Sequence, residues 1–366
     1  VAQDEIEDQE APPLLTDVEP PPGSQTPITQ ENAHQLSQLD SYEKTYVDDF
    51  AWSPDATKLA VADHTGVVVL DRYTQQEIQL IELRSQQYFF GHDITFSPDG
   101  NLLAVSIDSK EYSSNEPHWV VEVFDIQSQE KLFRFDAFVE NGIIWDAFGI
   151  AFSPDGAVLA TGWGNPWGFS PGGVKLWDVS KGTIIEEFGY ERLSVIYDLA
   201  FNPKGDLLAV ISGEGRVHIW ELETGEAVQH FQGTSGYGTA IAFSPGGNQF
   251  AVGGAGKVGR SYGYEPAELR LFDSSSGDLV YELEGHQAII RSVAFNPDGG
   301  VLASASDDGT VRLWNTQTGE QLALLDVPWA TSVSFSPDGT LLATAGFDDV
   351  LRLWGVPEPS AGIEGA

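Results

Sequence analysis

Four side chains in the last quarter of the chain have the types needed for a hydrolytic site. His286 is followed by Ser304 or Ser306, then by Asp308, and Trp314 lies just beyond. A serine, a histidine and an aspartate within hydrogen-bond reach can activate a nucleophile. Catalysis also needs an oxyanion hole and an exposed nucleophile, and the sequence gives no sign of either. Ser304 and Ser306 lie on the same face of a strand, so the sequence does not decide which of them belongs with His286 and Asp308.

Two further patterns resemble ligand sites. The segment GAGKVG at 254–259 fits G-x-G-x-x-G, but a phosphate site needs a helix after it, and RSYGYEPAELRLFD leads into a strand instead. We therefore expect a flexible loop. Three acidic pairs lack the spacing of a calcium loop and are interpreted as turn residues with solvated charge. The pairs are Asp48-Asp49, Asp307-Asp308 and Asp348-Asp349. The sequence predicts no cofactor and no metal site.

Charge excludes several classes of partner. The 366 residues include 18 Lys and Arg against 55 Asp and Glu, which gives a net charge of −37. Such an excess argues against binding nucleic-acid phosphates or an anionic membrane through a basic patch. Hydrophobic residues make up 41% of the chain, enough for a sizeable core. No stretch approaches 18 apolar residues, so no membrane-spanning segment is predicted.

Cysteine and methionine are both absent. Without cysteine there is no disulfide, thiolate metal site or cysteine nucleophile. The chain begins at Val1, as expected after removal of an export signal, although a shortened chain would look the same. We therefore expect an extracellular or cell-surface protein. The sequence does not separate a secreted protein from one that has lost a lipidated first residue.

Residues 1–32 differ in composition from the rest of the chain. They are rich in Pro, Asp and Glu and have no periodic apolar pattern. This composition favours extended, polyproline-like backbone that cannot fold alone. We expect an N-terminal arm that contacts a partner. Its candidate contact residues are Ile6, Pro12, Pro13, Leu14, Leu15, Val18, Pro20, Pro21 and Pro22.

One short phrase recurs seven times after the arm. It reads [AT]-[FW]-[SN]-P-x-[GA]-x-x-[LF]-A, with one Ser at its first position. The copies lie at 51–60, 95–104, 151–160, 200–209, 242–251, 294–303 and 334–343. Proline presets the turn and glycine permits positive φ, so each copy predicts a strand, a turn and a second strand. The copies start 40 to 56 residues apart, and repeats with such a period are typical of radial or solenoid architectures.

Every repeat also contains a third strand, and several show a fourth. The third strands end in an aromatic or leucine followed by Asp, Glu, Asn or Gly, as in VKLWD at 174–178 and VRLWN at 311–315. Examples of the fourth are 131–135, 184–188 and 279–283. Four short strands joined by tight turns predict an antiparallel sheet. Because one such sheet cannot cover both its faces, seven of them are expected to stack radially.

These residues resemble the WD-repeat family of β-propellers, most closely its exported bacterial members. Literal Trp-Asp occurs at Trp177-Asp178, and the Gly-His element occurs in register at Gly285-His286. The resemblance covers roughly residues 34–356. It implies an all-β fold with seven four-stranded antiparallel blades. It also implies that His286, Ser304, Asp308 and Trp314 form a structural hydrogen-bond network rather than a catalytic site.

Closure of the ring is a specific expectation. The last repeat ends its third strand at Trp354, and Pro357 and Pro359 argue against another strand there. The outer strand of the last blade should therefore come from residues 33–42, with His34–Leu39 as the best segment and Leu36 and Leu39 as packing residues. This divides the chain into an arm at 1–32, a propeller at 33–357 and a tail at 358–366.

Three expanded loops carry aromatic side chains. The connections at 108–119, 163–173 and 254–268 join second to third strands, so in a propeller they emerge on the face of the blade-to-blade connections. They hold Tyr112, Trp119, Trp163, Trp167, Phe169, Tyr262 and Tyr264, and the blade connections add Trp145, Tyr190, Tyr237 and Trp329. Rigid aromatics with Gly and Asn are typical of recognition surfaces. The alternative is that several fold inward and cap the channel.

The sequence therefore predicts a non-enzymatic extracellular scaffold that binds protein. Its partner is expected to be other copies of itself, gripped through the arm to form an oligomer or filament. The alternative is a recognition protein that binds a peptide, glycan or protein on the aromatic face. An enzyme using the central channel ranks last, because no catalytic constellation emerges.

Overall fold

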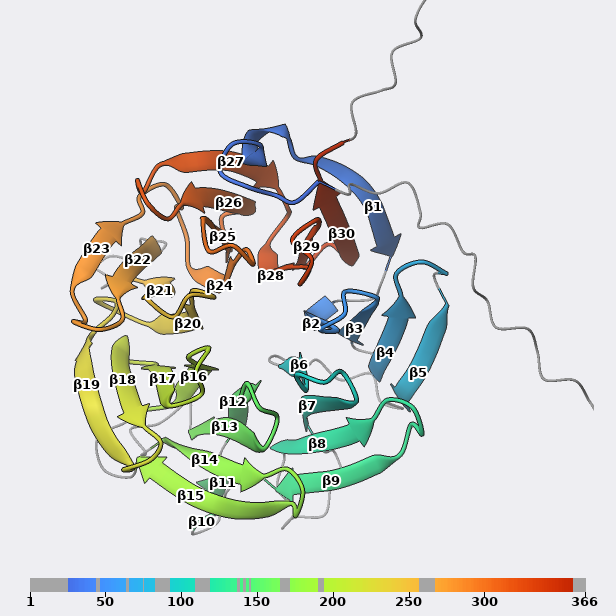
Figure 1. Ribbon diagram of the computed structural model, residues 1–366, viewed down its shortest axis with the longest axis vertical. Helices are drawn as coiled ribbons and strands as arrows, with labels where there is room; N and C mark the ends of the chain where they lie inside the picture. The colour runs from blue at the N-terminus through green and yellow to red at the C-terminus, as the bar shows by residue number, and fades with distance from the viewer. Residues whose placement is uncertain are drawn as a thin grey trace, which may run out of the picture.

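Seven four-stranded antiparallel sheets form a ring in the computed structural model (Figure 1). This confirms the predicted seven-bladed β-propeller. The structure describes residues 26–43, 47–63, 66–74, 76–82, 93–108, 119–136, 139–140, 143–144, 146–164, 172–189, 194–256 and 267–357. Among the described residues, no helix has the length and apolar composition needed to cross a membrane.

Each blade runs from an innermost to an outermost strand in chain order, except the last. Blade 1 contains β2 (Val47–Trp52), β3 (Lys58–Asp63), β4 (Gly66–Asp71) and β5 (Glu77–Glu82). Blade 2 contains β6 (Ile94–Phe96), β7 (Leu102–Asp108), β8 (Trp119–Asp125) and β9 (Lys131–Asp136). Blade 3 contains β12 (Asp146–Phe152), β13 (Val158–Gly164), β14 (Gly173–Asp178) and β15 (Thr183–Gly189). The short pair β10 (Val139–Glu140) and β11 (Ile143–Ile144) lies between blades 2 and 3 in the chain.

The remaining blades repeat this plan. Blade 4 contains β16 (Ile196–Phe201), β17 (Leu207–Ser212), β18 (Arg216–Glu221) and β19 (Glu226–Gln232). Blade 5 contains β20 (Gly238–Phe243), β21 (Gln249–Ala255), β22 (Ala267–Asp273) and β23 (Leu279–Glu282). Blade 6 contains β24 (Ile290–Phe295), β25 (Val301–Ser306), β26 (Thr310–Asn315) and β27 (Gln321–Asp326). Blade 7 contains β28 (Ala330–Phe335), β29 (Leu342–Gly346), β30 (Val350–Gly355) and β1 (Ser37–Glu43).

The recurring Ser-Pro turn is fixed by its own side chains. In blade 1, Ser53 Oγ donates to Asp55 Oδ1 at 2.6 Å and accepts from the Lys58 N–H at 2.8 Å. The fourth turn residue has positive φ in every blade, between 70° and 76° at the six glycines and 58° at Ala56. Asn296 replaces Ser in blade 6, where its Oδ1 accepts the Val301 N–H at 2.8 Å. The motif therefore specifies one turn that joins strands one and two of each blade.

The core lies between neighbouring blades. Seven clusters of buried apolar side chains, one at each seam, join the middle strands of adjacent sheets. One cluster joins Val121 and Val123 of blade 2 to Phe152 and Trp177 of blade 3, for example. Each blade therefore depends on its neighbours for burial, which explains why the ring must close.

Residues from the two ends of the propeller pair to close the ring. Strand β1 pairs antiparallel with β30, from Ser37 opposite Gly355 to Glu43 opposite Val350 (Figure 1). The strand begins at Ser37, three residues after the expected His34, because Ala33–Gln35 form a 3-10 turn, η1. Leu36 and Leu39 pack against buried core clusters. Blade 7 is thus built from both ends of the propeller.

The segment before η1 is anchored to the propeller, so the predicted boundary between arm and propeller at residues 32 and 33 moves toward the N-terminus. Ile28 is 1% exposed, its N–H donates to the Gly339 carbonyl at 2.8 Å, and its carbonyl accepts from Asn296 Nδ2 at 2.9 Å. Gln30 Nε2 donates to the Gly300 carbonyl at 2.9 Å. Ile28 is thus buried between the turns of blades 6 and 7, which explains why this segment docks there. Residues 1–25, with all the candidate arm contacts, and 358–366 lie outside the described residues.

Replacing Ile28 with alanine should destabilise the whole propeller. The change removes buried apolar surface where blades 6 and 7 meet, so we expect a loss of about 2–5 kcal/mol of unfolding free energy. Ile184→Ala is the matched control, because Ile184 is 49% exposed on β15, and it should cost less than about 0.5 kcal/mol. Urea unfolding measures both. Equal effects of the two changes would contradict a structural role for residues 26–32.

Candidate functional site

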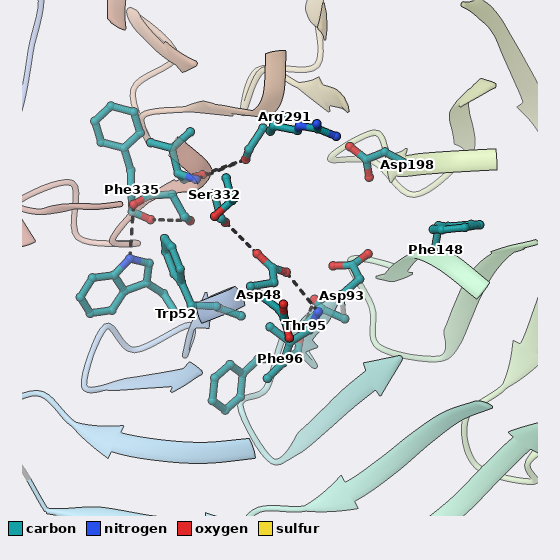
Figure 2. A pocket seen from close by; sticks show the side chains of 18 of the residues that line it. Asp48, Trp52, Asp93, Thr95, Phe96, Phe148, Asp198, Arg291, Ser332 and Phe335 are labelled. Atoms are coloured by element: carbon teal, nitrogen blue, oxygen red, sulfur yellow. Dashed lines mark hydrogen bonds between the residues drawn. The ribbon is translucent and has the colours of Figure 1, made fainter. Parts of the chain in front are cut away.

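A polar cavity of about 540 Å³ lies at the centre of the ring (Figure 2). The first strands of the blades supply much of its lining. Asp93, Asp198, Arg291 and Phe148 project toward the same space in the close-up. Its volume is within the range of small-ligand and side-chain pockets.

Two positions of the repeat supply much of the described lining of this cavity. The first lies six residues before the motif proline, and the second lies five residues before it. The first position is occupied in the described blades by Asp48, Phe148, Tyr197, Thr239, Arg291 and Thr331. The second is occupied by Asp49, Asp93, Gly149, Asp198, Ala240, Ser292 and Ser332. In most blades the register shifts beside these positions, as between Val47 and Asp49 in the pairing of β2 with β3. Such bulges re-aim side chains, here toward the channel.

Carboxylates in this lining join neighbouring blades. Asp49 of blade 1 accepts the Ile94 N–H of blade 2 at 3.2 Å. Asp93 of blade 2 accepts the Ile150 N–H of blade 3 at 2.7 Å. Asp198 of blade 4 accepts the Ile241 N–H of blade 5 at 2.8 Å. Each of these carboxylates therefore satisfies a backbone donor at a seam between blades.

Smaller residues join the other blades at the same level. Thr239 donates to the Ile290 carbonyl across the seam of blades 5 and 6. Ser292 of blade 6 accepts the Val333 N–H of blade 7 at 3.3 Å. Ser332 of blade 7 donates to Asp49 of blade 1 at 2.7 Å, so the last seam is joined in the same way. The exception is Gly149, where a Cβ would lie 2.9 Å from the Asp198 Cα. There the backbones of blades 3 and 4 pack directly together.

Enclosure in the channel changes the acidity of these carboxyl groups. Burial raises the pKa of Asp49 to about 6, although donors that include Ser332 oppose the shift. Burial raises the pKa of Asp198 to about 7, and the charge of Asp49 adds to it. Burial, followed by the charges of Asp49 and Asp198, raises the pKa of Asp93 well above its usual range. Enclosure therefore makes each of these three carboxyl groups harder to ionise than a carboxyl group in water.

Aromatic and polar groups complete the channel. Phe148 and Tyr197, from adjacent blades, lie 5.2 Å apart between ring centroids. Opposite them, Arg291 is engaged by Asp307 at 2.8 and 2.6 Å. The Thr331 hydroxyl is buried and has no hydrogen-bond partner among the described residues. Carboxylates beside aromatic faces suit a cationic side chain.

The four residues expected to form a structural network do form a buried chain of hydrogen bonds in blade 6. Trp314 Nε1 donates to Ser304 Oγ at 2.9 Å, and Ser304 Oγ lies 2.8 Å from His286 Nε2. His286 Nδ1 lies 2.9 Å from Asp308 Oδ2. Ser304 is 0% exposed and its oxygen already receives the indole N–H, so no substrate reaches it. Ser306 instead donates to the Ala288 carbonyl, which places Ser304 in the network.

Blades 3 and 7 contain a shorter version of this network. Trp177 Nε1 donates to Thr161 Oγ1 at 3.0 Å, and Trp354 Nε1 donates to Thr344 Oγ1 at 2.8 Å. Both threonines occupy the place of Ser304, directly after the Leu-Ala that ends the repeated phrase. A hydroxyl at this point therefore satisfies a buried indole in three blades.

The predicted aromatic surface is described only in part. Tyr112, Trp167, Phe169, Tyr262 and Tyr264 lie outside the described residues, as do Trp145 and Tyr190, and Trp119 is described only as the first residue of β8. Tyr237 and Trp329 are 51% and 58% exposed. They directly precede β20 and β28, the innermost strands of their blades. These two aromatics therefore stand at the end of the channel where the first strands begin.

Trp163 does not belong to the exposed surface, contrary to the prediction. It is 3% exposed at the end of β13. Its register partner is Gly173, and a Cβ at Gly173 would lie 2.8 Å from the indole ring. The missing side chain of Gly173 thus leaves room for the indole to lie against its own sheet.

The acidic pairs also depart from the prediction of solvated turn charge. Asp49 faces the channel, Asp308 joins the His286 network, and Asp348 forms an ion pair with Arg352. Among the described residues, no group of three or more His, Asp or Glu side chains is arranged to hold a metal ion. In the G-x-G-x-x-G segment, Gly254 and Ala255 belong to β21, and residues 257–266, which include the expected flexible loop, lie outside the described residues.

The acidic channel is the candidate functional site that the sequence analysis missed. Its signal is an aspartate five residues before the motif proline, present at Asp49, Asp93 and Asp198. Alignment of the seven copies on their prolines puts these residues in one column. The bulges in the first strands and the curvature of the ring then direct these aspartates toward the same channel.

Comparisons with known proteins agree with the fold. The WD domain, G-beta repeat family matches residues 277–315 and 321–355, and the WD40 domain of anaphase-promoting complex subunit 4 matches residues 191–246. Together with the seven blades, these matches support a WD-repeat β-propeller. No catalytic family is indicated among them.

Curated relatives are similar over part of their length. The chain is 27% identical to eukaryotic translation initiation factor 3 subunit I of Drosophila grimshawi, over 60% of this chain and 65% of that protein. It is 28% identical to the serine-threonine kinase receptor-associated protein of Gallus gallus, over 41% and 39%. It is 27% identical to the meiotic recombination protein rec14 of Schizosaccharomyces pombe, over 35% and 39%. The chain thus spans about two fifths to just under two thirds of these eukaryotic relatives, which do not support the exported bacterial qualifier.

Replacing Asp308 with asparagine should remove stability in a pH-dependent way. Burial alone would raise the pKa of Asp308, but hydrogen bonds from His286, Thr310 and the Gln287 N–H outweigh it and hold the pKa below its usual range. The stability gained is therefore present above the unfolded-state value near 3.9 and lost as pH falls below it. We expect Asp308→Asn to cost about 1–3 kcal/mol at pH 7 and progressively less toward pH 2.

Urea unfolding across this pH range measures the difference. Asp307→Asn is the matched control, because its partner Arg291 is half exposed, and it should cost less than about 1 kcal/mol at every pH. A cost for Asp308→Asn that stays constant with pH would contradict a charge-assisted network.

Proposed function

We propose that this protein is a non-enzymatic binding scaffold that receives a cationic segment of a partner protein in its central channel. The observation that carries the proposal is the channel itself, where Asp48, Asp49, Asp93 and Asp198 line one cavity beside the Phe148 and Tyr197 rings. A lysine or arginine side chain fits this combination, because carboxylates offer charge and aromatic faces attract cations.

Electrostatics and the approach to the channel support the same partner. A net charge of −37 attracts cationic segments from a distance and repels acidic ones. Exposed Tyr237 and Trp329 stand where the innermost strands begin and offer rigid contact surface. The names of two relatives, an initiation factor subunit and a receptor-associated protein, describe proteins that work together with others. That agrees with a role in protein binding.

Substitution of channel residues should weaken capture of cationic peptides. Asp48→Asn removes one charge and Phe148→Ala removes one aromatic face, and each should weaken binding about five- to tenfold. The probe is a set of fluorescent arginine- and lysine-containing decapeptides, with neutral glutamine versions as the comparison. Fluorescence anisotropy at fixed salt measures the dissociation constants.

Asp326→Asn is the control for net charge, because Asp326 is exposed on the outermost strand β27. It should leave binding unchanged. The proposal fails if cationic and glutamine peptides bind equally, or if Asp326→Asn weakens binding as much as Asp48→Asn.

A second proposal concerns self-association outside the cell through the N-terminal residues. It is favoured by the anchoring of Ile28 and Ala33, which fixes the point where the N-terminal residues join the propeller beside blades 6 and 7, while the propeller is closed by β1. Residues 1–25 would lie along another copy in this proposal. An exported location agrees with the lack of cysteine and the acidic composition.

Removal of residues 1–25 should abolish assemblies while the propeller stays folded. Residues 26–36 remain in this variant, so the anchoring contacts are kept. Light scattering measures particle size, and urea unfolding checks that stability is unchanged. Particles of the same size with and without residues 1–25 would refute the self-association.

A further inference from the structure

Two exposed aromatic side chains lie together on blade 7, at the end opposite its Ser-Pro turn. Trp329 directly precedes β28 and Phe347 directly follows β29, and these two strands pair antiparallel. Trp329 is 58% exposed and Phe347 is 38% exposed, and their ring centroids lie 6.5 Å apart at an interplanar angle of 60°. The two rings therefore form one exposed apolar surface, which we call the blade 7 patch.

The backbone of Trp329 is left-handed, with a φ of 52°. A bulky residue rarely adopts this conformation unless its surroundings impose it. Here the Phe347 N–H donates to the Trp329 carbonyl at 3.3 Å, and a Cβ at Gly346 would lie 2.2 Å from the Pro328 carbonyl oxygen. Glycine or asparagine would adopt the conformation of Trp329 more easily. A large ring that is both strained and exposed gains little from the core, which favours a role in binding.

The N-terminal residues join the propeller at the opposite face. The Ile28 N–H donates to the Gly339 carbonyl in the Ser-Pro turn of blade 7, and a Cβ at Gly339 would lie 3.8 Å from the Cβ of Pro27. This turn joins the ends of β28 and β29 that lie away from the blade 7 patch. Because β28 has six residues, about 20 Å of sheet separates the two features. Each copy thus carries the patch on one face and attaches its N-terminal residues at the other.

A run of prolines lies a few residues before this attachment point. Residues 20–24 read PPPGS and carry no charge, whereas Asp17 and Glu19 before them are acidic. This stretch lies outside the described residues. Proline-rich segments favour the polyproline helix, and aromatic side chains recognise such segments by packing against the proline rings. The composition of residues 20–24 therefore complements the blade 7 patch.

The reach of this stretch determines which patch it meets. Pro20 is six residues before Thr26, where the described chain begins, so it extends at most about 20 Å from that residue. A path round the outside of blade 7 to its own Trp329 must cover the length of β28, about 20 Å, and also pass the outer strands, about 5 Å each, outward and back. The prolines are too close to their attachment point for that path. A second copy stacked on the Ser-Pro-turn face presents its patch directly opposite them.

We propose that the blade 7 patch of one copy binds residues 20–24 of the next copy, which joins copies head to tail. The inference rests on the proposed self-association and names its two contact surfaces. Because these surfaces lie on opposite faces, every assembly keeps one of each unoccupied at its ends, so copies add in a row instead of closing as a symmetric dimer.

The net charge of −37 on each copy opposes this stacking. The contact itself is apolar and uncharged on both sides, so salt screens the repulsion without weakening the contact. Rising salt should therefore favour assembly. Capture of cationic peptides in the channel should respond in the opposite direction, because salt screens an attraction there.

Two variants of the full chain each remove one surface. Trp329→Asn removes the indole, and because asparagine tolerates left-handed backbone, the melting temperature should not fall by more than about 2 °C. Pro20→Ala, Pro21→Ala and Pro22→Ala, combined in one chain, remove the other surface. Each variant should need a concentration at least about tenfold higher than the natural chain to assemble. Light scattering over a concentration series measures this.

Matched controls change similar residues elsewhere. Tyr237→Asn removes an aromatic side chain that is 51% exposed at the same end of blade 5. Pro12→Ala with Pro13→Ala removes two prolines from the N-terminal residues outside 20–24. Both controls should assemble at the concentration of the natural chain. A loss of assembly with Tyr237→Asn as large as with Trp329→Asn would contradict a contact at blade 7.

Mixing the two variants tests whether the contact joins different copies. The Trp329→Asn chain keeps its prolines, and the triple-alanine chain keeps its patch, so one contact can form between them and none beyond it. The mixture should therefore form particles of twice the mass of one chain and no larger ones. Size-exclusion chromatography with light scattering measures this mass.

Three results would overturn the proposal, and they differ in what they leave standing. Assemblies that persist in both variants but vanish on removal of residues 1–25 would exclude this contact and leave self-association in place. A mixture that stays monomeric would show that residues 20–24 do not bind a second copy. A natural chain that is monomeric at every concentration and salt would refute the self-association itself, and this contact with it.

Discussion

Pairing of β1 with β30 is the interaction on which the propeller depends. Each sheet buries apolar side chains against both of its neighbours, so an open ring would expose two blade faces and a sheet edge. Strand β1 completes blade 7, and Ile28 then pins the preceding segment over the turns of blades 6 and 7. Closure uses no disulfide, because the chain has no cysteine.

The channel is a consequence of this closure. Seven first strands meet around one space, and in five blades the residue five positions before the motif proline reaches across a seam at that level. Aspartate is used where a backbone N–H of the next blade must be satisfied, as at Ile94, Ile150 and Ile241. Structural hydrogen bonding and negative charge are therefore combined in the same side chains. The same side chains thus hold the blades together and determine the acidity of the channel.

Much of the fold could be predicted because its turns and strands depend on contacts between residues that are close together in the chain. Ser53, Asp55 and Lys58 form their turn through contacts within six residues, and the same hydrogen bonds recur at the turns of blades 2, 3 and 7. The hydrogen bonds of Ser304 with His286 and Trp314 likewise follow a spacing that the sequence displays. The burial of Trp163 was not predicted, because it depends on the bare backbone of its register partner Gly173. The start of β1 was misplaced because Ala33–Gln35 bond to their own neighbours.

By itself, the sequence determined the number of blades, the order of strands within them and the acidic balance of the chain, since repeated turns and alternating apolar residues act over short distances. Only the tertiary structure decided which polar residues meet. Asp49 and Ser332 are far apart in the chain, yet their 2.7 Å hydrogen bond closes the circle of seams. The bulges in the first strands and the curvature of the ring bring such residues into contact, and neither is encoded in the spacing of one repeat.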